Sequence, residues 1–494
     1  MSYNCNVVKA PHSICWPSHL PLEIVSYIFK LSLRADAASI PDELAISSRS
    51  SVPLTLTWVC SSWRRLALSL PFLWTSVLLG SNGSRPSSDV QILDLFLTRS
   101  GDILPLSFVL NYDSLEPSTP ESSLPDHAQS ESYLTGMRRI AHRLISVRYR
   151  WRVLSLHVLY FSALEPFLQS LSFETPILEY LTISTKYNGF FGAKHTLELA
   201  SCPRLRSVRI LAPMIFSNPS ISSLKNLKNL ELGFCLSQLD AVMWLSSCRN
   251  LTHLSIKFYA AQAMDSSPSL LISLPHLMHL SIMCVYGDSD PANFIDALEL
   301  PSLRSLCLLT SDPFPVSSWR SLTDFLRRIK GKGLDNLQLI NTPMKPHELV
   351  QTLQCAGEIK QLALGGEAVT DEVLKALTAD RDTFTENLPS ENTIQLEHYK
   401  SLLCPKLELL ELHHISASPH MVEKLVVSRA LDSSDAKLPC SPLKKLVLVG
   451  DKRSPHFYYP STQWHLPSGL QIVFRVLEKD FDYETVAFSP TTDL

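Results

Sequence analysis

Leu274-Pro275-His276-Leu277-Met278-His279-Leu280-Ser281-Ile282 is one copy of a line that recurs through most of the chain. The shared pattern is [Cys/Leu]-x-x-Leu-x-x-Leu-x-[Leu/Ile]. Its last positions alternate apolar residues with other residues, which is typical of a strand that buries one face. Eight copies align without gaps, at residues 175–183, 202–210, 224–232, 248–256, 274–282, 300–308, 404–412 and 440–448. The pattern therefore predicts one strand in every repeat.

The spacing of the copies indicates the kind of repeat. The equivalent strand positions 181, 208, 230, 254, 280 and 306 are 27, 22, 24, 26 and 26 residues apart. This resembles the leucine-rich repeat, in which units of roughly 20–29 residues combine one strand with a helix or helical turn. The resemblance implies an α/β solenoid with parallel strands inside and helices outside. The family's Asn/Cys position is matched only by Cys235, so we expect the repeats to be irregular.

Other segments complete this predicted repeat region, which we place at residues 153–477. Looser copies of the pattern occur at residues 153–156, 334–339 and 359–364, and helices are predicted at 238–246, 319–329, 347–355 and 371–377. The polar residues 378–393 are predicted to form a loop insertion. Residues 470–477 are predicted to form the last strand, in a terminal repeat that is atypical because it caps the core.

Two short apolar segments near the N-terminus have a different character. Leu20, Ile24 and Ile28 recur at every fourth residue, and Pro21 suits the first turn of a helix, where its missing N–H has no partner to lose. A second segment, residues 58–66, places Val59, Trp63 and Leu66 on one side. Helices this short cannot bury so much apolar surface among themselves, so we expect them to contact a partner.

Together with residues 70–74, Leu-Pro-Phe-Leu-Trp, these segments resemble the F-box, so the chain resembles a fungal-type F-box protein with an irregular leucine-rich-repeat region. The resemblance implies a small all-α domain over residues 16–76 that binds a Skp-type adaptor and, through it, a cullin. The residues implied to contact the adaptor are Leu20, Pro21, Ile24, Ile28, Val59, Cys60 and Trp63. Residues 34–52 depart from the family pattern as a polar, Ser/Ala-rich lengthening of the link between the helices.

The remaining divisions follow from composition. Residues 1–15 and 478–494 are predicted tails, and residues 77–152 are a connecting region with the first irregular repeats. In this region we predict strands at 75–79 and 104–110, helices at 90–99 and 137–150, and a surface loop at 113–132, which is rich in Ser, Pro and Glu.

Composition narrows the possible functions. The formal net charge of −3 argues against a dedicated nucleic-acid or anionic-membrane binder. We expect neither a secretory signal nor a membrane span, because no stretch approaches about 18 uninterrupted apolar residues. Eleven cysteines without a Cys-x-x-Cys motif favour neither a disulfide framework nor a zinc site, so the cytoplasm, the nucleus or both are the expected location.

Few residues suggest chemistry. Cys202, Cys248, Cys404 and Cys440 occupy a repeat position that is Leu elsewhere, which favours small buried apolar groups over redox or metal ligands. His253 and His279 should lie side by side on neighbouring strands, but a metal pair would need further ligands. Six arginines between residues 138 and 152 suggest either a solvated helix face or an anion site. We expect no catalytic residues, no metal and no cofactor, and hence no enzyme.

The residues that alternate with the repeat leucines remain. They are Arg209, Glu231, Ser255, Lys257, Ser281, Met283, Glu411 and His413, beside His253 and His279. We expect Arg209, Glu231, His253, Lys257, His279 and Glu411 to contact a protein substrate, as the repeat region does in the family that the chain resembles. The resemblance implies the substrate-recognition subunit of a Skp–cullin–F-box ubiquitin ligase. The alternative is a repeat scaffold whose F-box-like segment works outside any ligase.

Overall fold

The computed structural model of the 494-residue chain shows a mixed α/β fold with a large parallel sheet. It describes residues 20–33, 42–113, 127–187, 196–199, 202–216, 224–262, 271–285, 291–311, 320–329, 333–379, 402–430, 440–451 and 470–477. The chain divides into two compact units. Unit 1 contains residues 1–190 and 200–204, and unit 2 contains residues 191–199 and 205–494.

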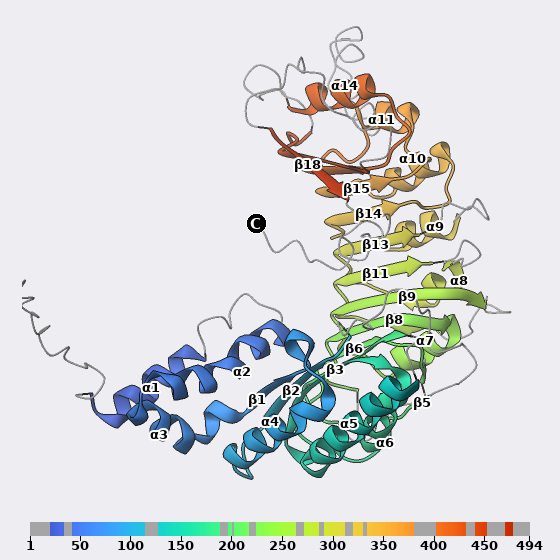
Figure 1. Ribbon diagram of the computed structural model, residues 1–494. Coiled ribbons are helices and arrows are strands. Elements are labelled where there is room, and N and C mark those ends of the chain that lie inside the picture. Colours follow the sequence, from blue (N-terminus) through green and yellow to red (C-terminus); the bar gives the residue numbers. More distant parts are fainter. Residues whose placement is uncertain are drawn as a thin grey trace, which may run out of the picture. The chain divides into compact units, whose positions relative to one another are not determined.

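Unit 1 combines the N-terminal helices with the first strands (Figure 1). Its α-helices are α1 (Leu22–Ser32), α2 (Asp42–Val59), α3 (Ser61–Ser69), α4 (Pro86–Arg99), α5 (His127–Ser146) and α6 (Glu165–Leu171). Its 3-10 helices are η2 (Pro71–Trp74), η3 (Ser81–Gly83), η4 (Arg148–Arg150) and η5 (Phe161–Ala163). Its strands are β1 (Ser76–Leu79), β2 (Leu106–Asn111), β3 (Trp151–Tyr160) and β4 (Tyr180–Tyr187), paired in parallel in that order. Because α1–α3 share this unit with the strands, a separate all-α unit is not evident.

Unit 2 carries the regular repeats. Its long strands are β6 (Ser207–Leu211), β8 (Asn229–Ser237), β9 (His253–Gln262), β11 (His279–Cys284), β13 (Ser305–Thr310), β14 (Asn336–Ile340), β15 (Gln361–Gly365), β16 (Leu409–His413), β17 (Lys445–Asp451) and β18 (Gln471–Leu477). They are hydrogen-bonded in that order, and every pair is parallel. Two short parallel pairs, β5 (Thr196–Leu197) with β7 (Ile215–Phe216) and β10 (Ile272–Ser273) with β12 (Leu298–Glu299), accompany this sheet.

The register of these strands confirms the sequence alignment of the repeats. Leu254 pairs with Leu230 on one side and with Leu280 on the other, and the equivalent leucines continue this row. The row extends through Leu306, Leu337, Leu362, Leu410 and Leu446. All of these side chains are buried, so they form one continuous apolar layer under the strands. A shift by one residue would turn the whole row toward solvent, which is why the register is so strongly specified.

Helices cover one side of the unit 2 strands (Figure 1). They are α7 (Gln238–Leu245), α8 (Ala292–Asp296), α9 (Arg320–Arg328), α10 (Pro346–Gln354), α11 (Asp371–Leu377) and α14 (Pro419–Ala430). The helices predicted at 238–246, 319–329, 347–355 and 371–377 are confirmed to within one residue, as are the strands predicted at 75–79 and 470–477. The loop predicted at 378–393 lies almost wholly outside the described residues, and the two predicted tails lie outside them entirely.

Three helices differ from the prediction at their boundaries, and the smallest difference is in α4, which begins at Pro86 and not at 90. Residues 34–52 were expected to be a polar link, yet α2 begins at Asp42 and runs through Pro53. A proline inside a helix removes one backbone hydrogen bond and usually ends the helix, but Pro53 is buried, so packing outweighs that loss. Likewise α5 begins at His127, inside the loop predicted at 113–132, and ends at Ser146 rather than at 150.

A buried arginine closes the C-terminal part of unit 2. Arg429 on α14 is almost fully buried, and its guanidinium donates to three backbone carbonyls, of Leu377 (2.6 Å), Leu403 (2.6 Å) and Cys404 (3.0 Å). Burial lowers the pKa of Arg429 below its usual value. The side chain therefore satisfies carbonyls that end α11 and precede β16, and it joins α14 to both segments.

Replacing Arg429 tests this role. Arg429→Met keeps most of the side-chain volume but leaves three buried carbonyls without donors, so we expect unit 2 to lose about 3 kcal/mol or more of stability. Urea unfolding followed by tryptophan fluorescence measures the loss. The control, Arg327→Met, removes an exposed arginine that pairs with the exposed Asp324 on α9, and it should change stability by less than about 1 kcal/mol. Equal effects of the two variants would contradict this role.

Candidate interaction surfaces

One side of α1 is apolar and exposed. Leu20, Ile24 and Ile28 are 42%, 47% and 40% exposed, while Val25 and Phe29 on the other side of the helix are buried. Leu22, Tyr27 and Leu31 are exposed as well. Leu20 lies just ahead of the helix, because Pro21 is the N-cap of α1 and not a residue of its first turn as predicted. Within α1 the spacing explains the division, because residues i and i+4 share one helix face. The predicted apolar face is therefore present and is open in the described chain.

The second predicted group has a mixed environment. Val59 is exposed at the C-terminal end of α2, next to the exposed Trp58, and Pro21 is exposed at the start of α1. Cys60 is the N-cap of α3, where its sulfur accepts a hydrogen bond from the backbone N–H of Trp63.

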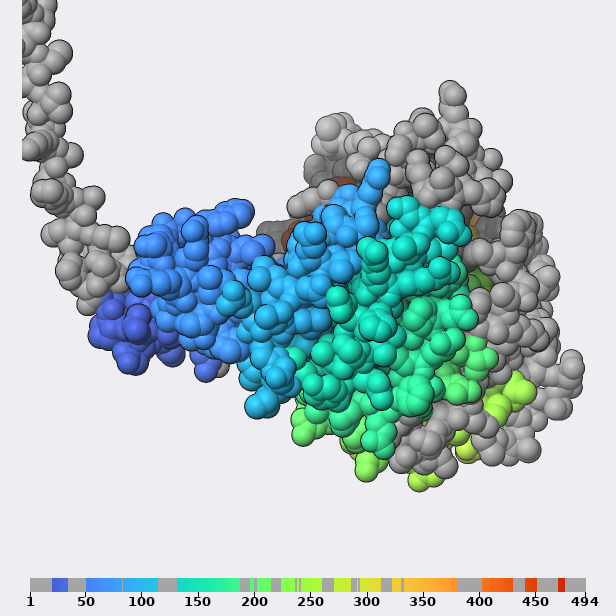
Figure 2. All heavy atoms as spheres, turned by 60° about the horizontal axis from the view of Figure 1, so that its bottom comes forward, coloured from blue at the N-terminus to red at the C-terminus, as the bar shows by residue number. Residues whose placement is uncertain are grey.

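Trp63 is only partly exposed, and its ring packs against that of Phe29 in a T-shaped arrangement with the ring centroids 4.9 Å apart. Cys60 and Trp63 therefore connect α1, α2 and α3. The helices lie together at one end of unit 1 (Figures 1 and 2).

The strand face of unit 2 brings several predicted residues together. Arg209 and Glu231 face each other on β6 and β8 and form an ion pair at 2.8 Å. His253 and His279 stack on β9 and β11, with ring centroids 4.4 Å apart and planes 10° apart. Both histidines are exposed, and Ser255 and Ser281 beside them are partly exposed. This part of the face is polar and accessible, as predicted.

Farther along the strands the same face is closed. Lys257, Met283 and His413 were expected to be exposed, and that expectation is wrong, because each is more than nine-tenths buried. Met283 packs in one cluster with Leu309 and Ile340, which occupy the same position on β13 and β14. The alternation of a strand assigns a face to each residue, but neighbouring strands decide whether that face is open.

A buried acid–base pair occurs on β16. Glu411 Oε1 lies 2.9 Å from His413 Nε2 and 3.6 Å from Arg475 on β18. Burial alone would raise the pKa of Glu411, but His413, Arg475 and Lys445 outweigh it and hold the pKa below its usual value. Glu411 is therefore an internal ion-pair partner, with little surface left for a substrate.

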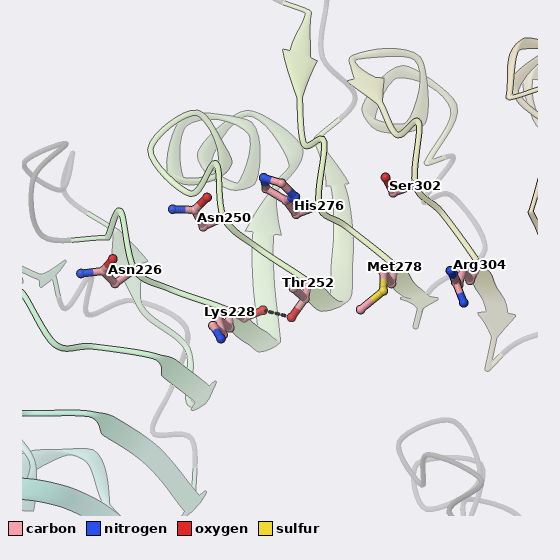
Figure 3. Close-up of a pocket in the computed structure, with 8 residues that line it drawn as sticks. All are labelled: Asn226, Lys228, Asn250, Thr252, His276, Met278, Ser302 and Arg304. Carbon is pink, nitrogen blue, oxygen red and sulfur yellow. Dashed lines mark hydrogen bonds between the residues drawn. The ribbon is translucent and has the colours of Figure 1, made fainter.

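A groove of about 440 Å³ lies at the N-terminal ends of β8, β9, β11 and β13 (Figure 3). We call it the edge groove. It is lined by Asn226, Lys228, Asn250, Thr252, His276, Met278, Ser302 and Arg304. Figure 3 shows these residues in two rows, one on the turns and one just ahead of the strands. They come from the same two positions of four consecutive repeats.

The alternation of side chains within a strand did not predict the edge groove, because the groove residues precede the strands. The repeat alignment could have identified them, since it places Lys228, Thr252, Met278 and Arg304 in one column. Their spacing is fixed by the backbone. The carbonyl of Lys228 accepts hydrogen bonds from the N–H groups of Thr252 (2.8 Å) and His253 (3.0 Å), and the same forked arrangement recurs at Thr252, Met278 and Arg304.

The cysteines and arginines that were candidates for chemistry have structural roles. Cys202, Cys248 and Cys404 are buried and Cys440 is partly buried, and burial raises the pKa of Cys248 and of Cys404 to about 12. Such thiols are unreactive near neutral pH. In the arginine-rich segment, Arg150 is buried and donates to the Leu104 carbonyl and to Ser100, while Arg143 pairs with Asp94 at 3.1 Å. These contacts favour a structural role over an anion site.

The described ranges contain no group of three or more His, Cys, Asp or Glu residues that is placed to hold a metal ion. None of the helices in the described part of the chain combines the length and the apolar composition needed to cross a bilayer. The features that remain are surfaces for contact: the apolar face of α1, the open part of the strand face, and the edge groove. The sequence matches no protein-family model, and no curated protein is significantly similar to it.

The stacked histidines make a testable prediction. Burial and the neighbouring His279 lower the pKa of His253 below 6.5, and burial and Arg304 lower the pKa of His279. NMR titration of the labelled histidine rings should therefore give midpoints below 6.5 for both. His279→Gln should raise the His253 midpoint only part of the way, because the burial remains.

The lowered pKa values of the two histidines also determine how folding stability changes with pH. In the unfolded chain both rings take up a proton near pH 6.5, whereas the folded pair resists it, so the pair lowers stability as the pH falls through that value. Above pH 6.5 the pair has no such effect. Titration midpoints at or above 6.5 for both rings would contradict the prediction.

Proposed function

We propose that the chain is the substrate-recognition subunit of a Skp–cullin–F-box type ubiquitin ligase. In this proposal α1–α3 form the F-box, which binds a Skp-type adaptor and through it a cullin. The repeats form an irregular leucine-rich-repeat solenoid that captures a protein substrate. The chain itself is not an enzyme, needs no cofactor, and works in the cytoplasm, the nucleus or both.

The observation that carries the proposal is the open apolar face of α1. Ile24 and Ile28 lie exposed on α1, Leu20 is exposed just ahead of it, and Trp58 and Val59 add exposed apolar surface at the end of α2. Burying side chains of this size yields about 1.5–3 kcal/mol each. A set of large apolar side chains on one helix face is therefore a strong indication of a protein partner.

Two features of unit 2 support a solenoid. All ten long strands are parallel and follow the chain order, and the helices between them lie on one side of the strands (Figure 1). Both are expected where each repeat contacts mainly its neighbours. A repeat array of this length offers an extended surface to a second protein, and the polar part of the strand face around Arg209, Glu231, His253 and His279 is where we place substrate contact.

One observation favours the alternative of a scaffold that works outside any ligase. The helices α1–α3 belong to the same compact unit as β1–β4, so they do not stand apart as a separate module. A scaffold could use the apolar face of α1 to hold another partner. The two proposals differ in whether a cullin is recruited. The ligase subunit recruits it through the adaptor, and the scaffold does not.

Charge substitutions on α1 test adaptor binding. The double variant Ile24→Asp/Ile28→Asp adds two carboxylates to the apolar face, so we expect the yield of co-purified Skp-type adaptor to fall by about tenfold or more. Ile92→Asp/Leu95→Asp on α4 is the matched control, because these side chains are similarly exposed (43% and 38%) in the same unit. The control should bind the adaptor normally.

Two results would count against the proposal. If the wild-type chain binds no adaptor, the ligase assignment is lost. If it binds the adaptor but recruits no cullin, the scaffold is the correct reading. Circular dichroism and the thermal midpoint of each variant show whether loss of binding merely reflects loss of folding.

A further inference from the structure

The edge groove belongs to a longer row of residues whose charges change along the sheet. One residue of each repeat lies just ahead of its strand, and we call this row the edge column: Arg206, Lys228, Thr252, Met278, Arg304, Asp335, Lys360, Glu408 and Lys444. In each case except the last, the backbone carbonyl accepts two N–H bonds from the next repeat. Neighbouring members are therefore held about one strand spacing, 4.8 Å, apart.

Beyond Arg304 the charged side chains of the edge column form ion pairs with one another. Asp335 pairs with Lys360 at 2.7 Å, and Glu408 pairs with Lys444 at 2.8 Å. In the turn row alongside, Glu358 pairs with Lys406 at 2.5 Å. Each cation in this half has a carboxylate on an adjacent repeat, so little charge is left for a ligand.

The half that contains the edge groove is different. Arg206, Lys228 and Arg304 are exposed, and within the described residues no carboxylate forms an ion pair with any of them. None of the eight residues that line the edge groove is acidic. Asp335, the next residue of the edge column after Arg304, is already engaged by Lys360. The edge groove is thus a cationic site built from fixed positions of consecutive repeats.

We propose that the edge groove binds an extended acidic peptide segment that carries two anionic side chains four residues apart with an apolar side chain midway between them. Lys228 and Arg304 are three strand spacings apart, about 14 Å. Four residues of extended chain cover the same distance, about 14 Å, and residues i, i+2 and i+4 of an extended chain point to one side. The outer two then meet Lys228 and Arg304, and the middle one meets Thr252 and Met278.

The lining of the edge groove favours a peptide over nucleic acid. Grooves that hold single-stranded nucleic acid combine a continuous cationic track with aromatic rings for base stacking. Here the cations stand at the ends of the strand-side row, whose centre is formed by a threonine hydroxyl and a methionine thioether, and His276 in the turn row supplies a single ring, too few for a series of stacked bases (Figure 3). A methionine adapts its shape to an apolar side chain. The formal net charge of −3 also gives the chain no general attraction for polyanions.

This inference rests on the proposed function in one respect: the acidic segment is taken to be part of the captured protein. The binding itself involves only unit 2 residues and needs no adaptor. Arg lies at one end and Lys at the other, so either carboxylates or phosphates can supply the anionic groups.

Fluorescence anisotropy with the purified full chain tests the proposal. The labelled probe is Gly-Ser-Glu-Ser-Leu-Ser-Glu-Ser-Gly, which has the required spacing, and a second probe replaces both Glu residues with phosphoserine. A shifted probe, Gly-Ser-Glu-Ser-Leu-Glu-Ser-Ser-Gly, has the same composition but the wrong spacing. We expect the shifted probe to bind about tenfold more weakly than the first, and binding of every probe to weaken as salt is added.

The variant Lys228→Glu/Arg304→Glu should weaken binding of the matched probe by about tenfold or more. The control Lys406→Glu/Lys444→Glu makes the same change of charge in the paired half, leaves the Asp335–Lys360 pair beside Arg304 intact, and should keep the wild-type affinity. Both pairs are exposed, and thermal unfolding confirms that each variant is folded. The ratio of affinities for the Glu and phosphoserine probes identifies which anionic group the edge groove prefers.

Several results would overturn the proposal: equal affinity for the matched and shifted probes, equal loss in the two variants, or tighter binding of a single-stranded oligouridine than of either matched probe. Adaptor co-purification with the same variants keeps this test distinct from that of the proposed function. The Lys228→Glu/Arg304→Glu chain should bind the adaptor normally, and the Ile24→Asp/Ile28→Asp chain should bind the probe normally.

Discussion

The forked hydrogen bond between consecutive repeats is the constraint on which unit 2 depends. At each step the carbonyl ahead of one strand accepts two N–H groups from the next repeat, as Met278 does from Arg304 and Ser305, both at 2.9 Å. These bonds satisfy backbone groups that would otherwise be left open where the turn becomes a strand. They also fix the register, and the register puts every repeat leucine into one buried row.

Where this regular pattern is interrupted, buried charged side chains take its place. In unit 1 the carboxylate of Asp89 accepts hydrogen bonds from the Gly80 backbone and the hydroxyls of Ser84 and Tyr112. In unit 2 the guanidinium of Arg429 donates to three carbonyls between α11 and β16. In each case one side chain meets three polar groups, because a buried polar group without a partner is costly.

The sequence was most informative where a residue's role depends on near neighbours in the chain. The repeat leucines, the helix at 371–377 and the apolar face formed by Leu20, Ile24 and Ile28 all follow from local spacing. Burial on the strand face did not, because it depends on what the next strands carry. Ser281 and Met283 lie on the same face of β11, yet only Met283 is buried, against Leu309 and Ile340 from β13 and β14. The start of α2 was missed because packing outweighs the helix-breaking tendency of Pro53.

The edge column shows how irregular repeats can keep one backbone and vary its surface. The forked bonds hold the column in place whatever its side chains are, so its members are free to differ. Where successive members alternate in sign, as from Asp335 to Lys444, they attract one another across one strand spacing and close the surface to charged ligands. Where two uncharged residues, Thr252 and Met278, separate the cations, that internal attraction is lost and the charge faces outward. Leucines therefore set the fold, and a single position per repeat sets which stretch of the edge can bind an anion.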